Sequence, residues 1–108
     1  MRMHLRGPRT EWTEALRQHV ARRLHFALSR FSQSITSVTV DIGSAARIPD
    51  NSPRTCRLTV HLAPKSKLVL VEESQGDLYA PLSLLAEQAG RAVERSLDRE
   101  RSFRPHSR

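Results

Sequence analysis

The sequence predicts an α+β domain in which two helices pack on one face of a four-stranded mixed sheet, in the chain order β-α-β-β-β-α. Two observations predict it. Four short segments alternate apolar and polar residues, which is the period-2 pattern of strands, and two longer segments repeat apolar residues every three to four positions, as amphipathic helices do. The 108 residues of the chain correspond to one domain. Two helices that cover one face of a sheet bury both apolar stripes together.

The first strand and the first helix are expected within residues 1–31. Apolar and basic residues alternate in the opening MRMHLR, which predicts a short strand with one apolar and one cationic face. Gly7-Pro8 ends this strand, and Thr10 is the expected N-cap of a helix that spans about 11–31. The apolar stripe of this helix consists of Trp12, Leu16, Val20, Leu24, Ala27 and Phe31.

Three more strands and a loop follow the first helix. The strands are expected at residues 35–42, 56–62 and 67–73. Residues 43–53, GSAARIPDNSP, contain turn formers and two prolines, so we expect a mobile loop there. A strand, a helix and a second strand form a right-handed unit with parallel strands, and hairpins join the remaining strands. Leu68-Val69-Leu70-Val71 is apolar on both faces, and we interpret it as an ordinary, partly buried strand.

The second helix begins after Asp77, the expected N-cap. Its apolar stripe consists of Leu78, Leu82, Leu85, Ala89, Val93 and Leu97. Pro81 is tolerated near the first turn, and Gly90 costs about 1 kcal/mol relative to alanine, for which close packing against the sheet would be one reason. From about Asp98 the chain is polar and rich in arginine. We therefore expect one domain over residues 1–98 and a basic, flexible tail over 99–108.

The charge of the chain indicates an anionic partner. It has 18 Lys and Arg residues against 11 Asp and Glu, a formal net charge of +7 and a pI near 11.2. A small domain this basic typically binds nucleic acid, a membrane surface or an acidic protein. The alternative is that the charge only increases the solubility of the protein. Only Lys65 and Lys67 are lysines. Since the planar arginine fork grips phosphate at two points and stacks on bases, the composition favours RNA over lipid.

The single cysteine and the hydropathy narrow the cellular setting. Cys56 is the single cysteine, so no intramolecular disulfide forms. The sequence therefore gives no indication of an oxidising compartment. No apolar run approaches the roughly 20 residues needed to span a bilayer, and the first six residues do not resemble a signal peptide. We therefore expect a cytoplasmic protein without a membrane partner.

Catalytic and metal-binding patterns are scarce. Cys56 alternates in register with Leu58 and is best interpreted as a small core residue. His19 and His25 lie about 240° apart around a helix and cannot share an ion. There is no glycine-rich phosphate loop and no spaced carboxylate pair. We expect no enzyme, metal site, cofactor or small-molecule substrate.

Arginines are the candidate binding residues. They lie on the first helix, on the second helix and on the outer face of the sheet: Arg17, Arg22 and Arg23; Arg91, Arg95 and Arg99; and Arg57. The alternative for the second helix is pairing within the helix, of Glu87 with Arg91 and of Glu94 or Asp98 with Arg95, which is worth only a few tenths of a kcal/mol per pair. The outer strand positions carry no pair of aromatic residues on which bases stack, so we expect recognition of folded RNA by its shape and backbone charge.

Two motifs resemble one family. The run WTEALRQHV over residues 12–20, with Gly7 before it and Arg22-Arg23-Leu24 after it, resembles the first helix of the ribosome hibernation-promoting factors. This family includes ribosome-associated inhibitor A and was once called the sigma-54 modulation proteins. Asp77-Leu78-Tyr79-Ala80 resembles the Asp-Met-Tyr-Ala opening of that family's second helix. The resemblance covers roughly residues 1–97 and implies the β-α-β-β-β-α fold.

The resemblance implies a function as well as a fold. It implies a non-enzymatic protein that binds 16S rRNA of the small ribosomal subunit near the decoding region and inhibits translation in stationary phase or stress. By position, the family's basic residues correspond to Arg22, Arg23, Arg91 and Arg95. The chain departs from the pattern at Pro81, at Gln88 and in the length of its 43–53 loop. It resembles the short class of the family, and we expect the isolated protein to be a monomer.

A second hypothesis belongs to a different functional class. The chain would be a divergent protein-interaction module of the same fold that acts as a regulator without direct ribosome binding. Its basic face would dock an acidic partner, or its open sheet face would self-associate, as the apolar run at 68–71 suggests.

Overall fold

The computed structural model describes residues 1–44 and 53–103, with side chains described to residue 43 and from 53 to 100. Most of the loop expected at 43–53 and the last five residues lie outside the described residues. The elements are β1 (Arg2–Arg6), α1 (Glu14–Leu28), the 3₁₀ turn η1 (Ser29–Phe31), β2 (Ile35–Ser44), β3 (Arg54–Leu62), β4 (Ser66–Ser74) and α2 (Tyr79–Phe103). Their order confirms the predicted α+β fold.

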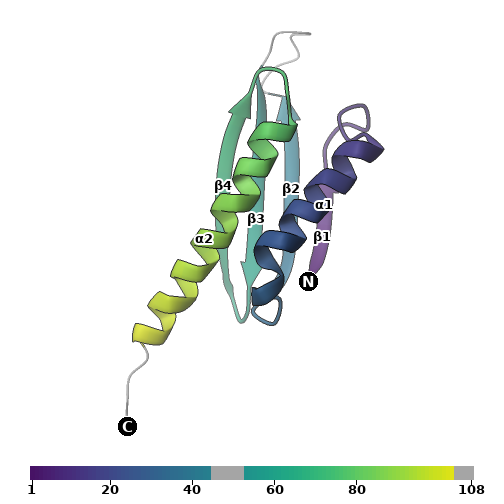
Figure 1. Ribbon diagram of the computed structural model, residues 1–108. Helices are drawn as coiled ribbons and strands as arrows, with labels where there is room; N and C mark the ends of the chain where they lie inside the picture. The colour runs from purple at the N-terminus through teal and green to yellow at the C-terminus, as the bar shows by residue number, and fades with distance from the viewer. Residues whose placement is uncertain (45–52, 104–108) are drawn as a thin grey trace.

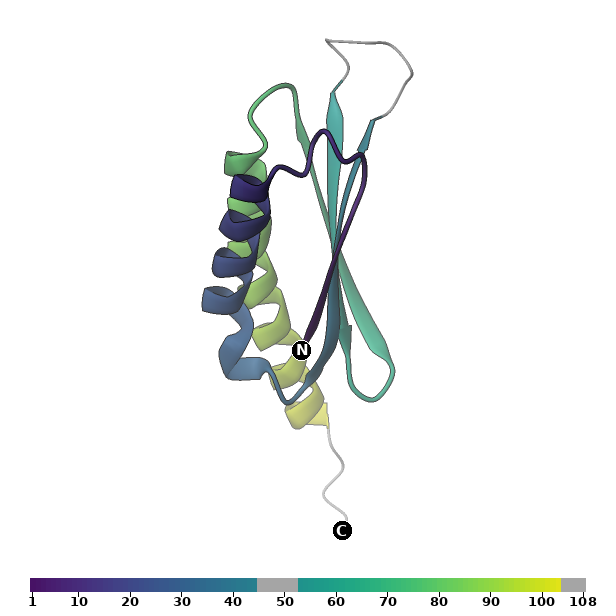
Figure 2. The ribbon, with the colours of Figure 1, turned by 90° about the vertical axis from the view of Figure 1, so that its right-hand side faces the viewer.

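The domain has two layers. The strands form one sheet in the order β1-β2-β3-β4, in which β1 runs parallel to β2 and the other neighbours are antiparallel. Both helices lie against one face of this sheet, and within residues 1–44 and 53–103 its other face carries no helix (Figures 1 and 2). The predicted mixed sheet with a single helix layer is therefore confirmed.

The core lies between the helices and the inner face of the sheet. Inward residues of β2 and β3 include Val38, Val40, Cys56, Leu58 and Val60, each at most 1% exposed. From α1 the buried residues follow a stricter four-residue spacing than predicted: Leu16, Val20, Leu24 and Leu28. Ala27 and Phe31 are only partly buried. Ala27 faces Gly90 of α2 rather than the sheet, and Phe31 lies in the 3₁₀ turn, which changes the direction of the side chains after Leu28.

The prediction that Thr10 caps the first helix is wrong. Thr13 is the N-cap, and its hydroxyl accepts a hydrogen bond from the Leu16 amide at 3.2 Å. A turn precedes it, in which the Glu11 amide donates to the Pro8 carbonyl at 3.0 Å. The Trp12 indole donates to the Arg6 carbonyl at 2.9 Å, so the preceding residues are held against the end of β1 and the helix begins later.

The start of α2 is as predicted, but its end is not. The Asp77 carboxylate accepts hydrogen bonds from the amides of Tyr79 at 3.0 Å and Ala80 at 3.3 Å. The helix continues to Phe103, so residues 99–103 of the expected tail are helical, and its last turns extend past the end of the sheet (Figure 1). Good helix formers such as glutamate and arginine dominate this stretch, which explains why helix persists without a core beneath it.

Gly7 shapes the connection from β1 to α1. Its φ of 134° lies in the region that side chains rarely adopt. A Cβ at this position would lie 2.6 Å from the Ile42 carbonyl oxygen. The chain therefore requires glycine where it leaves β1 and crosses to the helix layer. In the part of the chain that the structure describes, no helix has the length and hydropathy to cross a membrane.

Candidate nucleic-acid interface

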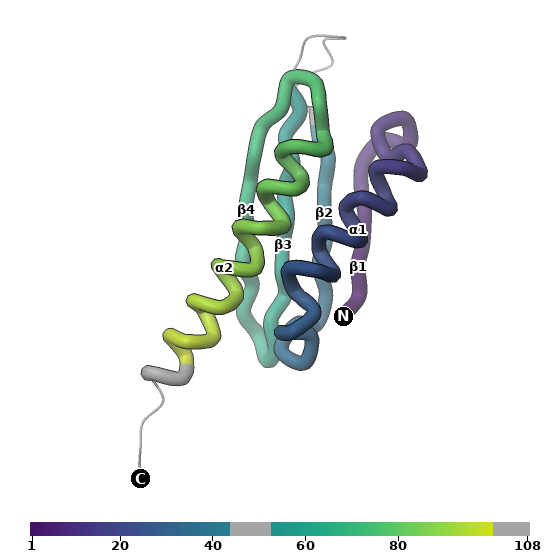
Figure 3. The backbone as a smooth tube through the Cα atoms, viewed as in Figure 1, coloured from purple at the N-terminus to yellow at the C-terminus, as the bar shows by residue number. Residues whose placement is uncertain are grey.

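The helix layer is the surface on which the sequence placed most candidate residues. α1 and α2 lie next to each other and run in the same direction (Figure 3). Polar contacts join them along their length. His19 Nε2 of α1 lies 2.6 Å from the Ser83 hydroxyl, and Arg30, in the η1 turn that follows α1, donates to the Glu94 carboxylate at 3.3 Å. These contacts fix the spacing between the arginines of one helix and those of the other.

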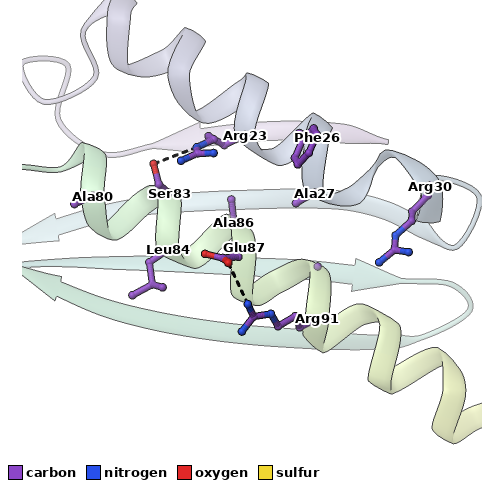
Figure 4. Close-up of a pocket in the computed structure, with 11 residues that line it drawn as sticks. Arg23, Phe26, Ala27, Arg30, Ala80, Ser83, Leu84, Ala86, Glu87 and Arg91 are labelled. Carbon is purple, nitrogen blue, oxygen red and sulfur yellow. Dashed lines mark hydrogen bonds and ion pairs between the residues drawn. The ribbon is translucent and has the colours of Figure 1, made fainter.

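A groove of about 790 Å³ runs between the two helices. Figure 4 shows the residues that line it. From α1 they are Arg23, Phe26 and Ala27, from η1 Arg30, and from α2 Ala80, Ser83, Leu84, Ala86, Glu87, Gly90 and Arg91. The lining thus combines a small apolar floor with three guanidinium groups and one carboxylate. Such a surface suits a ligand that has both an apolar part and negative charge.

The structure brings some of the predicted arginines together. Arg23 of α1 and Arg91 of α2 line the same groove, and the Arg23 guanidinium donates to the Ser83 hydroxyl at 3.4 Å. Arg22 is exposed and is two residues from the buried Leu24, about 200° around the helix, so it points away from the sheet. The helix layer therefore carries cations on its outer side from both helices.

The other predicted helix arginines lie outside the groove. Arg17, Arg95 and Arg99 are exposed, and none of them lines the groove. Arg95 and Arg99 follow Arg91 by about one and two turns of α2. The three arginines therefore form a cationic stripe along one side of that helix. The predicted residues thus form a central group at the groove and a periphery around it.

Only some of the arginines of the helix layer form ion pairs. The predicted pair of Glu87 with Arg91 is present at 3.1 Å, with side chains 62% and 68% exposed, so it is weak and open to exchange. Of the two partners predicted for Arg95, Glu94 or Asp98, Glu94 instead pairs across the helix layer with Arg30 of η1. Among the described residues, the ion pairs do not include Arg22, Arg95 or Arg99.

Arg57 does not join the helix arginines. Its β3 neighbours Cys56 and Leu58 are buried toward the helices, so Arg57 points to the opposite face. There it lies beside Asp41 of β2 and Val71 of β4. The same face carries Arg2, His4, Arg6, His61 and Lys67. The molecule therefore has a second cationic face, separated from the helix layer by the thickness of the sheet.

Among the groove residues that sequence reasoning missed are Phe26 and Ser83. Phe26 is 85% exposed, although phenylalanine is usually buried. The signal for it was present, because Phe26 falls outside the apolar stripe of the first helix. Ser83 was missed as well; its hydroxyl contacts both His19 and Arg23. No pattern in the sequence indicates that link between the helices.

The geometry gives no support to Cys56 as a nucleophile or to a metal site among the described residues. Cys56 has no exposed surface, and burial, aided by the Glu72 carboxylate, raises the pKa of its thiol to about 11. A thiol that stays protonated at neutral pH is a poor nucleophile. Within residues 1–43 and 53–100, no group of three or more His, Cys, Asp or Glu side chains is placed to hold a metal ion.

Comparisons with known proteins indicate the family of the chain and agree with its fold. A family model described as "Sigma 54 modulation protein / S30EA ribosomal protein" matches residues 3–101. Among solved structures, the chain is similar to the N-terminal domain of Protein Y from Thermus thermophilus, with a TM-score of 0.66 and 23% sequence identity. That similarity covers 88% of this chain and 98% of the other. The comparison with curated proteins returns no match.

Proposed function

The chain belongs to the sigma 54 modulation protein / S30EA ribosomal protein family, and from this premise we propose that it is a ribosome hibernation factor. It binds 16S rRNA of the small subunit near the decoding region and inhibits translation in stationary phase or stress. It acts in the cytoplasm. It inhibits by occupying its binding site on the small subunit and not by catalysing a reaction. Family membership supports the association with ribosomes, and the arginines of the helix layer support the choice of RNA as the direct ligand.

One observation carries the proposal: arginines of two different helices meet at one groove. Arg23 of α1, Arg30 of η1 and Arg91 of α2 line it, and Arg22, which precedes Arg23 in the chain, is exposed. Guanidinium groups bind phosphate oxygens in pairs of parallel hydrogen bonds. A rigid two-helix surface holds several such groups at fixed spacing, so it recognises the fixed phosphate spacing of folded RNA better than a flexible basic tail does.

The weak ion pairs of the surface fit this role. The Glu87–Arg91 pair is solvent-exposed on both sides, and such pairs contribute at most about 1 kcal/mol. A phosphate that approaches Arg91 replaces one weakly held anion with another that makes stronger, bidentate contacts. Inhibition then follows from steric exclusion, because a folded domain bound near the decoding region prevents mRNA and tRNA from occupying the same space.

Co-sedimentation with purified small subunits tests the proposal. The variant with Arg22, Arg23, Arg91 and Arg95 all changed to Glu lowers the net charge from +7 to −1, and we expect it to remain in the supernatant. A matched control changes Arg2, Arg57, Lys65 and Lys67 to Glu, which gives the same net charge on the sheet side of the molecule. Circular dichroism checks that both variants are folded.

The control separates a specific surface from charge alone. If the helix variant pellets with the subunits as the native chain does, the helix layer is not the binding surface. If both variants lose binding to the subunits equally, binding depends on net charge and not on a defined interface. Inhibition of translation in a cell-free system should follow the same order as binding, with the helix variant inactive and the sheet variant active.

A second candidate function rests on the uncovered sheet face. Val69 and Val71 on the outer side of β4 are 50% and 48% exposed. A protein-interaction module that regulates without ribosome binding would use this face to dock a partner. It predicts that Val69→Ser with Val71→Ser abolishes capture of one protein partner from stationary-phase cells, and that rRNA is absent from the captured material.

A further inference from the structure

We propose that Phe26 is a stacking platform for an unpaired nucleobase of RNA, with the phosphates beside that base held by the guanidinium groups of Arg23, Arg30 and Arg91. The inference rests on the proposed function, since it specifies which part of an RNA the inter-helix groove takes. The proposed function rests on the charge of this surface. Stacking on Phe26 adds a contact between the surface and the base itself.

The exposure of Phe26 is the first observation that supports it. The side chain is 85% exposed in the last turn of α1, so it adds almost nothing to the core. Phenylalanine is also a poorer helix former than alanine. Neither folding nor helix stability accounts for an aromatic ring at this position, whereas a ring whose faces are open to solvent is what base stacking requires.

The surroundings of the ring are the second observation. Arg23 precedes Phe26 by three residues and lies on the same side of α1, and Arg30 of η1 lines the same groove as both. Arg91 lines the groove from α2 (Figure 4). An unpaired nucleotide has a flat apolar base and an anionic phosphate on either side. Cations on both sides of an exposed ring match that arrangement of charge.

The shape of the groove disfavours a peptide as its occupant. An acidic amphipathic helix would need a row of apolar contacts spaced along the groove. The apolar lining besides Phe26 is small, with Ala27, Ala80, Ala86 and Gly90, and only Leu84 is larger. One large flat ring and a shallow floor favour one flat ligand group over a row of side chains. We therefore assign the groove to a nucleobase.

The first experiment compares two RNA probes by fluorescence anisotropy. One is an oligoadenylate of about 12 nucleotides, within the usual site size for single strands, and the other is a fully paired RNA duplex with the same number of phosphates. Phe26→Ala should weaken binding of the single strand by about 5- to 150-fold, the loss associated with one stacked base. It should change binding of the duplex less than about two-fold, since every arginine remains.

A second measurement reports on the ring itself. Phe26→Trp should restore single-strand binding, and its emission should be quenched when the oligoadenylate stacks on it. The native Trp12 is 6% exposed and supplies a constant background. Val71→Trp is the matched control, because position 71 is exposed on the opposite face of the sheet, and its emission should stay unquenched.

The outcomes separate this inference from the proposed function. Native chain that binds small subunits, together with Phe26→Ala that binds both probes like the native chain, overturns the stacking platform alone. Native chain that binds neither subunits nor either probe overturns both. An acidic amphipathic peptide that shifts the emission of Phe26→Trp, while the oligoadenylate does not, identifies a protein-docking groove and overturns the nucleobase as ligand.

Discussion

Gly90 of α2 lies directly against Ala27 of α1. A Cβ at position 90 would be 3.1 Å from the Ala27 carbonyl oxygen and 3.6 Å from the Ala27 Cβ. The sequence suggested packing of this glycine against the sheet, and the structure shows that it packs against the neighbouring helix instead. The close approach of the two helices, and hence the distance between their arginines, depends on this missing side chain.

Substitution of Gly90 therefore departs from the usual helix rule. Alanine gains about 1 kcal/mol in helix propensity over glycine, but here its methyl group presses on a backbone oxygen. We expect Gly90→Ala to change the free energy of unfolding by less than about 1 kcal/mol. Gly90→Val should destabilise by about 1–3 kcal/mol, because two further carbons cannot fit. Urea denaturation measures both, and a clear stabilisation by alanine would contradict the close contact.

Gly7→Ala should destabilise the fold more than its position on the surface suggests. The positive φ alone costs about 1–3 kcal/mol for a residue with a side chain, and the 2.6 Å approach to the Ile42 carbonyl adds to this loss. Gly76→Ala is the matched control, because a Cβ there would meet nothing within 4 Å. Equal midpoints of thermal unfolding for the two variants would show that the β1–α1 connection tolerates a side chain.

Glu87→Gln should strengthen RNA binding. The substitution removes a negative charge from the groove and releases Arg91 from its ion pair. Since an exposed pair contributes about 0.2–1 kcal/mol, we expect the dissociation constant for small subunits to fall by about 1.5- to 5-fold. Glu73→Gln on the outer side of β4 changes the net charge equally and serves as control. An effect of the same size from Glu73→Gln would indicate a general charge effect.

Cys56 should make the fold less stable at alkaline pH. Its pKa in the fold is about 11, against an ordinary value of 9.0. Between these values the unfolded chain releases the thiol proton and the folded chain retains it, so the free energy of unfolding falls as pH rises from about 9 to 11. The loss should reach roughly 2–3 kcal/mol. Denaturation across this range should show a steeper decline for the native chain than for Cys56→Ala, and parallel declines would contradict the burial of the thiol.

The fold was predictable because its signals are local and repeated. Alternation in β2 and β3 and the three- to four-residue spacing in α2 each depend on many residues, so a single exception does not alter the prediction. The N-cap of α1 was not predictable in this way. Thr10 and Thr13 both have the chemistry of a cap, and the choice depends on the Trp12 contact with the Arg6 carbonyl, which forms only after β1 and the turn are in place.

The site was predictable in its chemistry but not in its geometry. Arginine content and helical spacing identified Arg23 and Arg91, which line one groove. Side-chain partners across the helices depend on packing, so the pairing of Glu94 with Arg30 had no sequence signal. Alternation along the strand placed Arg57 correctly on the outer face of the sheet, but its charge alone did not show that this face and the helix layer are separate surfaces.

Arg57 also provides the sharpest test of which face contacts RNA. Each arginine that neutralises a phosphate contributes about 0.7–0.9 to the slope of log affinity against log salt concentration. Arg22→Gln and Arg91→Gln should each lower the slope by about that amount. Arg57→Gln should leave it unchanged, because Arg57 lies on the sheet face opposite the helices. The slopes come from filter binding of labelled 16S rRNA over a range of salt concentrations. A lower slope for Arg57→Gln, with native slopes for the two helix variants, would move the RNA to the sheet face and contradict the helix-layer interface.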